Sequence, residues 1–171
     1  NGTITIDSSD DAIHSNDRMT VNGGTIVIAS GDDGLHADAT LLINGGELAI
    51  TKSYEGIESA AITINDGAIR VVSSDDGINT AGGADGSALG GRPGRNTFSD
   101  SGDYSLTITG GYVAVDALGD GIDSNGPIDM SDGVVLINGP TGNMNGALDY
   151  MGSFTITGGL LVAAGSSGMA Q

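Results

Sequence analysis

The chain of 171 residues contains no cysteine and no tryptophan, and only five of its residues are lysine or arginine. Without cysteine the chain has no disulfide bond and no thiolate metal ligand, and this absence fits a reducing or an oxidising compartment equally well. Against the five basic residues stand 22 acidic ones, which gives a formal net charge of −17 at pH 7. Such a field repels nucleic acid and anionic membranes. We therefore expect as partners cations, basic surfaces, or acidic polymers bridged by a divalent metal.

Long apolar runs and helix signals are missing as well. The chain shows no transmembrane run and no signal peptide, so we expect no membrane insertion, and any targeting signal would lie outside this sequence. No segment keeps a period of 3.6 residues, and no helix cap precedes an apolar run, which excludes a doubly wound α/β fold. Apolar residues alternate instead with polar or small ones, and this alternation predicts short strands.

What the sequence does contain is a repeat, marked by a glycine at the turn before each alternating run. This glycine recurs at Gly2, Gly24, Gly46, Gly67, Gly111, Gly133 and Gly159. The steps between these positions are 22, 22, 21, 44, 22 and 26 residues. We interpret the step of 44 as one period that carries an insertion, and the step of 26 as one period with about four extra residues near Pro140.

Stacking the periods aligns apolar residues in columns that should point inward. The four columns begin at Ile4, Ile6, Val21 and Ile13, and the last of them ends at Met169. Three short strands in each period of about 22 residues, stacked on similar neighbours, predict an all-β parallel β-helix of about seven coils. We expect residues 1–171 to form a single domain.

The insertion, Ala81 to Asp103, is rich in glycine and too long to be a simple connection. It contains Arg92 and Arg95, two of the five basic residues. One interpretation is a mobile loop. The other is a loop folded over one face of the β-helix, where Arg92 and Arg95 help to bind an anionic or sugar ligand.

An acidic phrase recurs once per period, most clearly as Asp75-Asp76-Gly77-Ile78-Asn79. Stacking the copies aligns a first column, which consists of Asp11, Asp33, Glu55, Asp76, Asp120 and then Asn145. Asp10, Asp32 and Asp75 directly precede three of these residues and add further negative charge. Three residues further on lies a second column: His14, His36, Glu58, Asn79, Asp123 and Asp149. In a β-helix these columns become ladders of like charge.

These ladders would destabilise the fold unless something offsets them. Like charges about 5 Å apart cost about 3 kcal/mol per pair at an effective dielectric constant near 20. Calcium accepts six to eight oxygen ligands in flexible geometry, so two neighbouring coils could bind it. The sequence therefore predicts Ca²⁺ bound by these residues: Asp11, Asp32, Asp33, Glu55, Glu58, Asp75, Asp76, Asn79, Asp120 and Asp123.

Two alternatives to calcium remain. The acids could be hydrated side chains that accept hydrogen bonds from backbone amides of their own turns. His14 and His36, one coil apart, could bind a transition metal, although zinc is less favoured in a chain without cysteine.

Taken together, the "DDGI" phrases, the "TITGG" turns and the closing "LLVAAGSSGMAQ" resemble the bacterial carbohydrate-binding β-helix proteins of cellulose-degrading clostridia. That family is polysaccharide-lyase-like in fold and binds cellulosic and acid sugars such as polygalacturonate. The resemblance covers nearly the whole chain except the insertion. It implies a right-handed helix, bound calcium, and a secreted or cell-surface location. It assigns calcium to the acidic phrases at Asp32-Asp33, Asp75-Asp76 and Asp120 to Asp123.

We expect a non-catalytic module that binds acidic or cellulosic polysaccharide, with Tyr112 offering a face on which a sugar ring could stack. A calcium-dependent polysaccharide lyase would need a base, for which Lys52, Arg70, Arg92 and Arg95 are candidates. Because the acids are spread evenly along the repeat rather than focused, we assign no catalytic residue.

A structural role is the other alternative. The chain starts within a coil and ends in one, and solenoid ends need a cover. We therefore expect either a segment of a longer protein or a unit that packs end to end. The last coils also place apolar residues outward, at Val134, Leu136, Leu160 and Val162.

Overall fold

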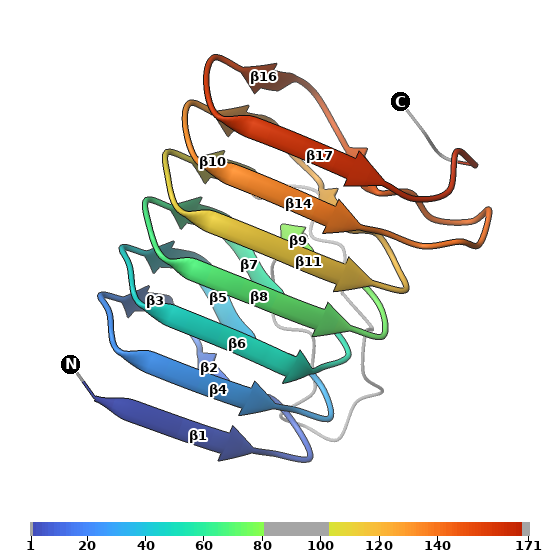
Figure 1. The fold of residues 1–171 in the computed structure, drawn as a ribbon. Helices are drawn as coiled ribbons and strands as arrows, with labels where there is room; N and C mark the ends of the chain where they lie inside the picture. The colour runs from blue at the N-terminus through green and yellow to red at the C-terminus, as the bar shows by residue number, and fades with distance from the viewer. Residues whose placement is uncertain (1, 81–102, 169–171) are drawn as a thin grey trace.

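The computed structural model describes residues 2–80 and 103–168, and within them the chain forms strands and no helix. The strands lie in two parallel sheets (Figure 1). The first sheet contains β1 (Thr3–Asp7), β4 (Thr25–Ala29), β6 (Glu47–Lys52), β8 (Ala68–Ser73), β11 (Tyr112–Ala117), β14 (Val134–Asn138) and β17 (Leu160–Ala164). The second contains β2 (Ile13–Ser15), β3 (Arg18–Val21), β5 (Leu35–Ile43), β7 (Ile57–Ile64), β9 (Ile78–Thr80), β10 (Ser105–Ile108), β12 (Ile122–Ser124), β13 (Ile128–Met130), β15 (Leu148–Tyr150) and β16 (Phe154–Ile156).

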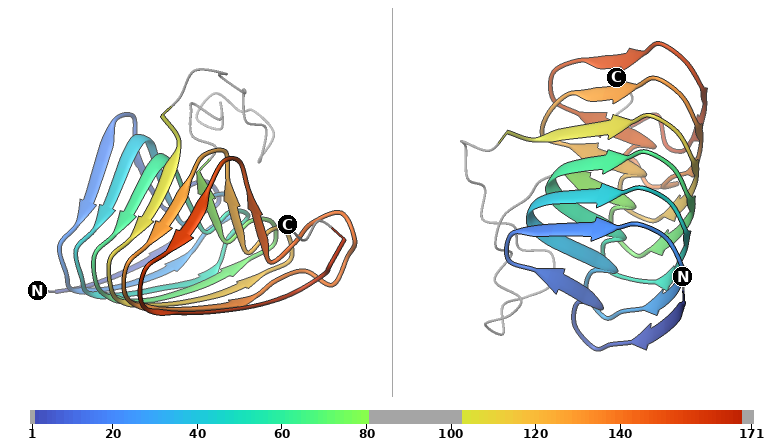
Figure 2. Two further views of the ribbon diagram at one scale, coloured as in Figure 1. Left: turned by 90° about the horizontal axis from the view of Figure 1, so that it is seen from above. Right: turned by 90° about the vertical axis from the view of Figure 1, so that its left-hand side faces the viewer.

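These strands build the predicted parallel β-helix. Six complete turns run from β1 to β16, and β17 begins a seventh. In Figure 1 the first sheet faces the viewer with its strands running from left to right, and the chain returns behind it while climbing towards the C-terminus. The winding is therefore right-handed, and Figure 2 shows the coils stacked in register along the axis.

The predicted inward columns are confirmed by the strand register. Ile4 pairs with Ile26, Ile26 with Leu48, and Leu48 with Ile69 along the first sheet. In the second sheet Ile57 pairs with Ile78, and the column continues through Ile122 to Leu148. The members in the middle coils are buried, whereas Ile4 in the terminal strand β1 is 51% exposed. Met169 lies outside the described residues.

The step of 44 residues is one coil, as predicted, because β8 pairs directly with β11. The insertion separates β9 from β10, and residues 81–102 lie outside the described residues. From the second coil onward, the glycine at the turn before each strand of the first sheet has a positive φ. Gly46, for example, has a φ of +104°, a conformation that side chains with a Cβ rarely adopt.

Two details of the predicted repeat are wrong. The second and third strands of a coil run on as one strand in β5 and in β7, and the register between these two strands shifts between Ala37 and Thr40. In the sixth coil Gly146, not Asn145, continues the first acidic column. Ile122 pairs with Leu148, which places Gly146 opposite Asp120, and Asp120 Oδ1 accepts a hydrogen bond from the amide of Gly146. Gly146 precedes Leu148 by two residues, as Asp120 precedes Ile122.

Candidate functional site

The acidic phrases form the corner at which each coil passes from the first sheet to the second. Asp11 Oδ1 accepts a hydrogen bond from the amide of Asp33 on the next coil at 3.2 Å. Asp76 Oδ1 accepts one from the amide of Asp120 at 2.6 Å, and Asp120 Oδ1 accepts one from the amide of Gly146. These acids therefore do accept from backbone amides, as one alternative predicted, but the amides belong to the next coil rather than to their own turn.

Three acids of the later coils form an all-oxygen cluster. One carboxylate oxygen from each of Asp76, Asp120 and Asp123 lies within 4.8 Å of the other two. Burial, with Asp75 as the next cause, raises the pKa of Asp76 to about 8. Burial, followed by the charges of Asp120 and Asp149, raises the pKa of Asp123 to about 7. Burial also raises the pKa of Asp120. A divalent cation at this cluster would favour the ionised carboxylates.

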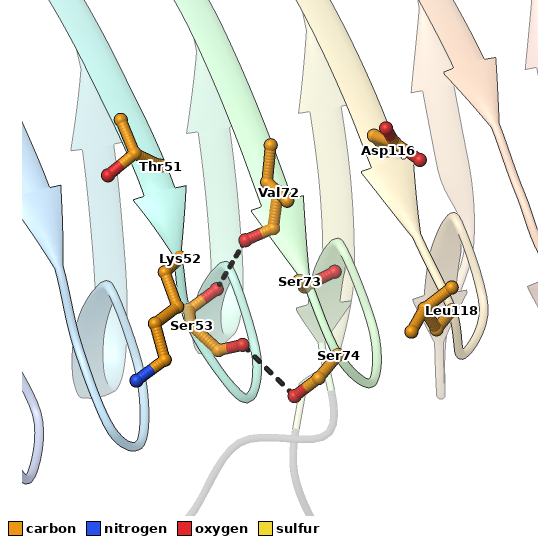
Figure 3. Close-up of a pocket in the computed structure, with 8 residues that line it drawn as sticks. All are labelled: Thr51, Lys52, Ser53, Val72, Ser73, Ser74, Asp116 and Leu118. Carbon is orange, nitrogen blue, oxygen red and sulfur yellow. Dashed lines mark hydrogen bonds between the residues drawn. The ribbon is translucent and has the colours of Figure 1, made fainter.

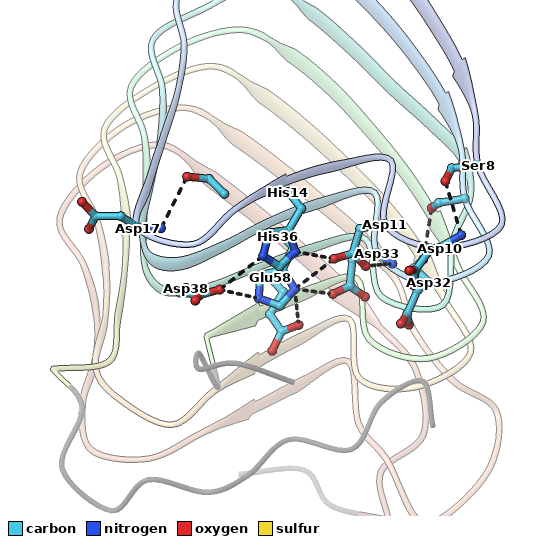
Figure 4. A network of polar contacts seen from close by, with 12 residues as sticks. Ser8, Asp10, Asp11, His14, Asp17, Asp32, Asp33, His36, Asp38 and Glu58 are labelled. Carbon is cyan, nitrogen blue, oxygen red and sulfur yellow. Dashed lines mark hydrogen bonds and ion pairs between the residues drawn. The ribbon is translucent and has the colours of Figure 1, made fainter. Parts of the chain in front are cut away.

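In the first three coils the corresponding cluster contains both histidines (Figure 4). His14 Nδ1 lies 2.7 Å from Asp11 Oδ2, and the two imidazole rings stack with their centroids 4.6 Å apart. His36 Nδ1 lies 3.1 Å from Asp33 Oδ2 and 3.6 Å from both Asp11 Oδ2 and Glu58 Oε2. On the far side of the rings Asp38 Oδ1 lies 3.6 Å from His14 Nε2 and 3.5 Å from His36 Nε2.

This histidine cluster is largely buried. The side chains of His36, Glu58, Asp33 and Asp11 are 0%, 1%, 3% and 6% exposed, and those of His14 and Asp38 are 27% and 26% exposed. Potential metal-ligand atoms of Asp11, His14 and His36, one from each residue, lie within 4.8 Å of one another, and so do those of Asp33, His36 and Glu58. The two groups share His36.

The remaining predicted ligands have other surroundings. Asp32 groups with Asp10 and Asp11 at the edge of the histidine cluster. Glu55 Oε2 accepts a hydrogen bond from Asn79 Nδ2 at 2.7 Å, and burial raises the pKa of Glu55 well above its usual value. Asp75 lies beside Tyr54, whose pKa is raised first by its hydrogen bond to Asp75. The structure thus distributes the residues of the two predicted columns among separate groups.

A second feature lies on the outer face of the first sheet, beside the acidic corner (Figure 3). It is an open groove of about 300 Å³ at the ends of β6, β8 and β11. Eight residues line it: Thr51, Lys52, Ser53, Val72, Ser73, Ser74, Asp116 and Leu118. The side chains of Val72 and Leu118 are 44% and 71% exposed, so the groove offers apolar surface flanked by hydroxyl groups and two charges.

Tyr112, the predicted sugar contact that lies within the described residues, does not line this groove. Tyr112 is half-buried rather than exposed, and the guanidinium carbon of Arg70 lies 5.4 Å from the centre of its ring, so Arg70 covers one ring face. Arg92 and Arg95 lie outside the described residues.

Sequence reasoning missed Asp38 and the groove for the same reason. Asp38 lies opposite Asn16 of the first coil and just where the register between β5 and β7 shifts, so the carboxylate is not part of a repeated acidic column. The groove residues Thr51, Val72 and Asp116 share one row across three strands but have no common chemistry. Neither feature repeats, and stacking the periods finds only what repeats.

Comparison with known proteins gives one similarity. Residues 1–34 match a family model described as "Carbohydrate-binding domain-containing protein". This segment covers β1 to β4 and includes His14, Asp32 and Asp33. A comparison with curated proteins found no match, and neither did a comparison with solved structures. In the part of the chain that the structure describes, no helix is long and apolar enough to cross a membrane.

Proposed function

We propose that this protein is a non-catalytic carbohydrate-binding β-helix that binds polysaccharide along the groove of its first sheet. The observation that carries the proposal is the groove itself, in which exposed Val72 and Leu118 lie among hydroxyl and charged side chains. The similarity of residues 1–34 to a carbohydrate-binding family supports the same function. A location outside the cell, secreted or at the cell surface, fits a protein that binds plant polysaccharide.

The groove has the chemistry that a pyranose needs. The C–H face of a sugar ring packs against apolar side chains, while its hydroxyl groups exchange hydrogen bonds with polar groups around the rim. Thr51, Ser74 and Asp116 supply such groups. The groove also crosses successive coils, which lie about 4.8 Å apart. A polysaccharide that runs parallel to the axis of the β-helix could therefore place neighbouring sugar units against neighbouring coils.

Calcium would extend this binding to acidic polysaccharide. A polyuronate and a protein with a net charge of −17 repel each other unless a cation bridges them. The all-oxygen cluster of Asp76, Asp120 and Asp123 suits Ca²⁺, which takes carboxylate oxygens in flexible geometry. Calcium should then raise the melting temperature, EDTA should lower it, and Asp76→Ala should weaken this response.

Catalysis is not part of the proposal. A lyase needs a base aligned with a metal-bound uronate. Of the candidate bases, Arg70 lies against Tyr112, while Lys52 lines the groove. Incubation with polygalacturonate and Ca²⁺ should give no rise in the absorbance of unsaturated product.

Affinity electrophoresis tests the proposal. The protein is run through gels that contain polygalacturonate or a soluble cellulose derivative, each with Ca²⁺ or with EDTA. Retention by polygalacturonate that EDTA abolishes identifies an acidic ligand bridged by calcium. Retention by the cellulose derivative in both conditions identifies a neutral glucan. Retention by neither polymer contradicts carbohydrate binding and favours a structural unit that packs end to end.

A further inference from the structure

The histidine cluster contains a combination of ligands that calcium does not prefer. Calcium binds oxygen, whereas imidazole together with carboxylate suits zinc and other first-row divalent metals. Here the Nδ1 atoms of the two imidazoles lie on the same side as three carboxylates, those of Asp11, Asp33 and Glu58. His14 and His36 are the two histidines of the sequence, so every imidazole signal of the protein comes from this cluster.

The spacing of these atoms fits a coordination shell. Metal–ligand bonds of about 2.0–2.2 Å place neighbouring ligands about 2.9–3.6 Å apart. His36 Nδ1 lies 3.1 Å from Asp33 Oδ2 and 3.6 Å from both Asp11 Oδ2 and Glu58 Oε2. The contact of 2.7 Å between His14 Nδ1 and Asp11 Oδ2 is a hydrogen-bond distance, and a cation would displace its proton.

The opposite side of the rings has what a metal-bound histidine needs. If both Nδ1 atoms bind a cation, the ring protons lie on Nε2. Asp38 Oδ1 faces both Nε2 atoms, at 3.6 Å from His14 and 3.5 Å from His36. A carboxylate behind the ligating imidazole is the usual arrangement, because it fixes the tautomer and the ring orientation.

From this geometry we propose that Asp11, His14, Asp33, His36 and Glu58 form a site for a divalent transition metal such as Zn²⁺, with both histidines coordinating through Nδ1. Asp38 is a positioning residue that accepts the Nε2 protons. The site joins the first three coils, since Asp11 and Asp33 lie in the corners after β1 and β4, and His14, His36 and Glu58 lie at the second residue of β2, β5 and β7. It is distinct from the all-oxygen cluster and does not depend on carbohydrate binding.

Titration with Zn²⁺ after dialysis against EDTA tests the site, followed by nitrogen-detected NMR of the two imidazoles in the full chain. The expected result is a large shift of both Nδ1 resonances, with both Nε2 atoms protonated, reversed by EDTA. Zinc binding that leaves these resonances unchanged, or that shifts the Nε2 atoms instead, overturns the proposal.

Variants provide a second measurement. His14→Ala changes a partly exposed residue, and it should weaken zinc binding in calorimetry by at least about tenfold. His36→Gln should do the same, but its burial makes unfolding a risk, so His14→Ala decides. Asp123→Asn, in the other cluster, is the matched control and should bind Zn²⁺ like the unchanged protein. Equal zinc affinity in the His14 variant and the control contradicts the site.

Discussion

At the scale of single residues, close packing requires the glycine that follows the acid in the second to fifth coils, at Gly34, Gly56, Gly77 and Gly121. A Cβ added to Gly77 would lie 2.6 Å from the carbonyl oxygen of Gly121 and would also contact Val115 Cγ1. The φ angle of Gly77 is not among the positive ones, so space rather than backbone conformation is the constraint. The corner at Gly77 therefore leaves no space for a side chain at this residue.

Gly77→Ala should destabilise the protein by about 1–3 kcal/mol, the usual cost of overpacking a core. Chemical denaturation measures this change in the free energy of unfolding. Gly142→Ala is the control, since an added Cβ there meets nothing within 4 Å. If both variants unfold at the same denaturant concentration, close packing is not the reason for Gly77.

The crowded carboxylates predict how stability depends on pH in the metal-free protein. The pKa of Asp76 is about 8 in the folded protein and about 4 in the unfolded chain. The folded state thus holds a proton that the unfolded state releases, so this stabilisation is complete below about pH 4 and is lost as the pH rises to about 8.

In EDTA the melting temperature should therefore fall between about pH 5 and about pH 8. Asp76→Asn keeps a neutral side chain at every pH, so its melting temperature should fall less over this range. Asp129→Asn, on an exposed residue of β13, should keep the unchanged slope. A slope in the Asp76 variant as steep as that of the control would show that this carboxyl group does not contribute.

At the scale of strands, β8 tests the register on which every column depends. Ile69 and Val71 are buried, whereas Arg70 between them is exposed. Ile69→Ala should cost about 2–5 kcal/mol because it leaves a cavity in the core. Arg70→Ala should cost less than about 1 kcal/mol, since it loses only its contact with the ring of Tyr112. Urea denaturation of both variants compares these values, and equal losses would contradict the register.

The strands were predictable because their pattern repeats and their inner face is uniform. The inward columns could be aligned from spacing alone, and the pairing of Ile26 with Leu48 and of Leu48 with Ile69 follows this alignment. The merging of strands in β5 and the shift at Asp38 could not be predicted, because each depends on one residue more or fewer in a single corner. The histidine pair was visible in the sequence, but the carboxylate behind it was not.

At the scale of the whole molecule, the β-helix separates two kinds of surface. The corner gathers acids and histidines into buried or half-buried clusters, while the outer face of the first sheet carries the open groove. Zinc binding at the histidine cluster and ligand binding in the groove should therefore respond to different substitutions. We propose that the groove binds polysaccharide.

Isothermal titration calorimetry with cellohexaose and hexagalacturonate tests this claim most directly, with Ca²⁺ present. Leu118→Asp places a charge on the apolar surface of the groove, and Leu160→Asp places the same charge on the same sheet away from the groove residues. We predict that the Leu118 variant binds the preferred oligosaccharide at least about tenfold more weakly, about 1.4 kcal/mol, while the Leu160 variant binds it like the unchanged protein. Equal affinity in all three proteins, or no heat of binding with either oligosaccharide, would contradict the account.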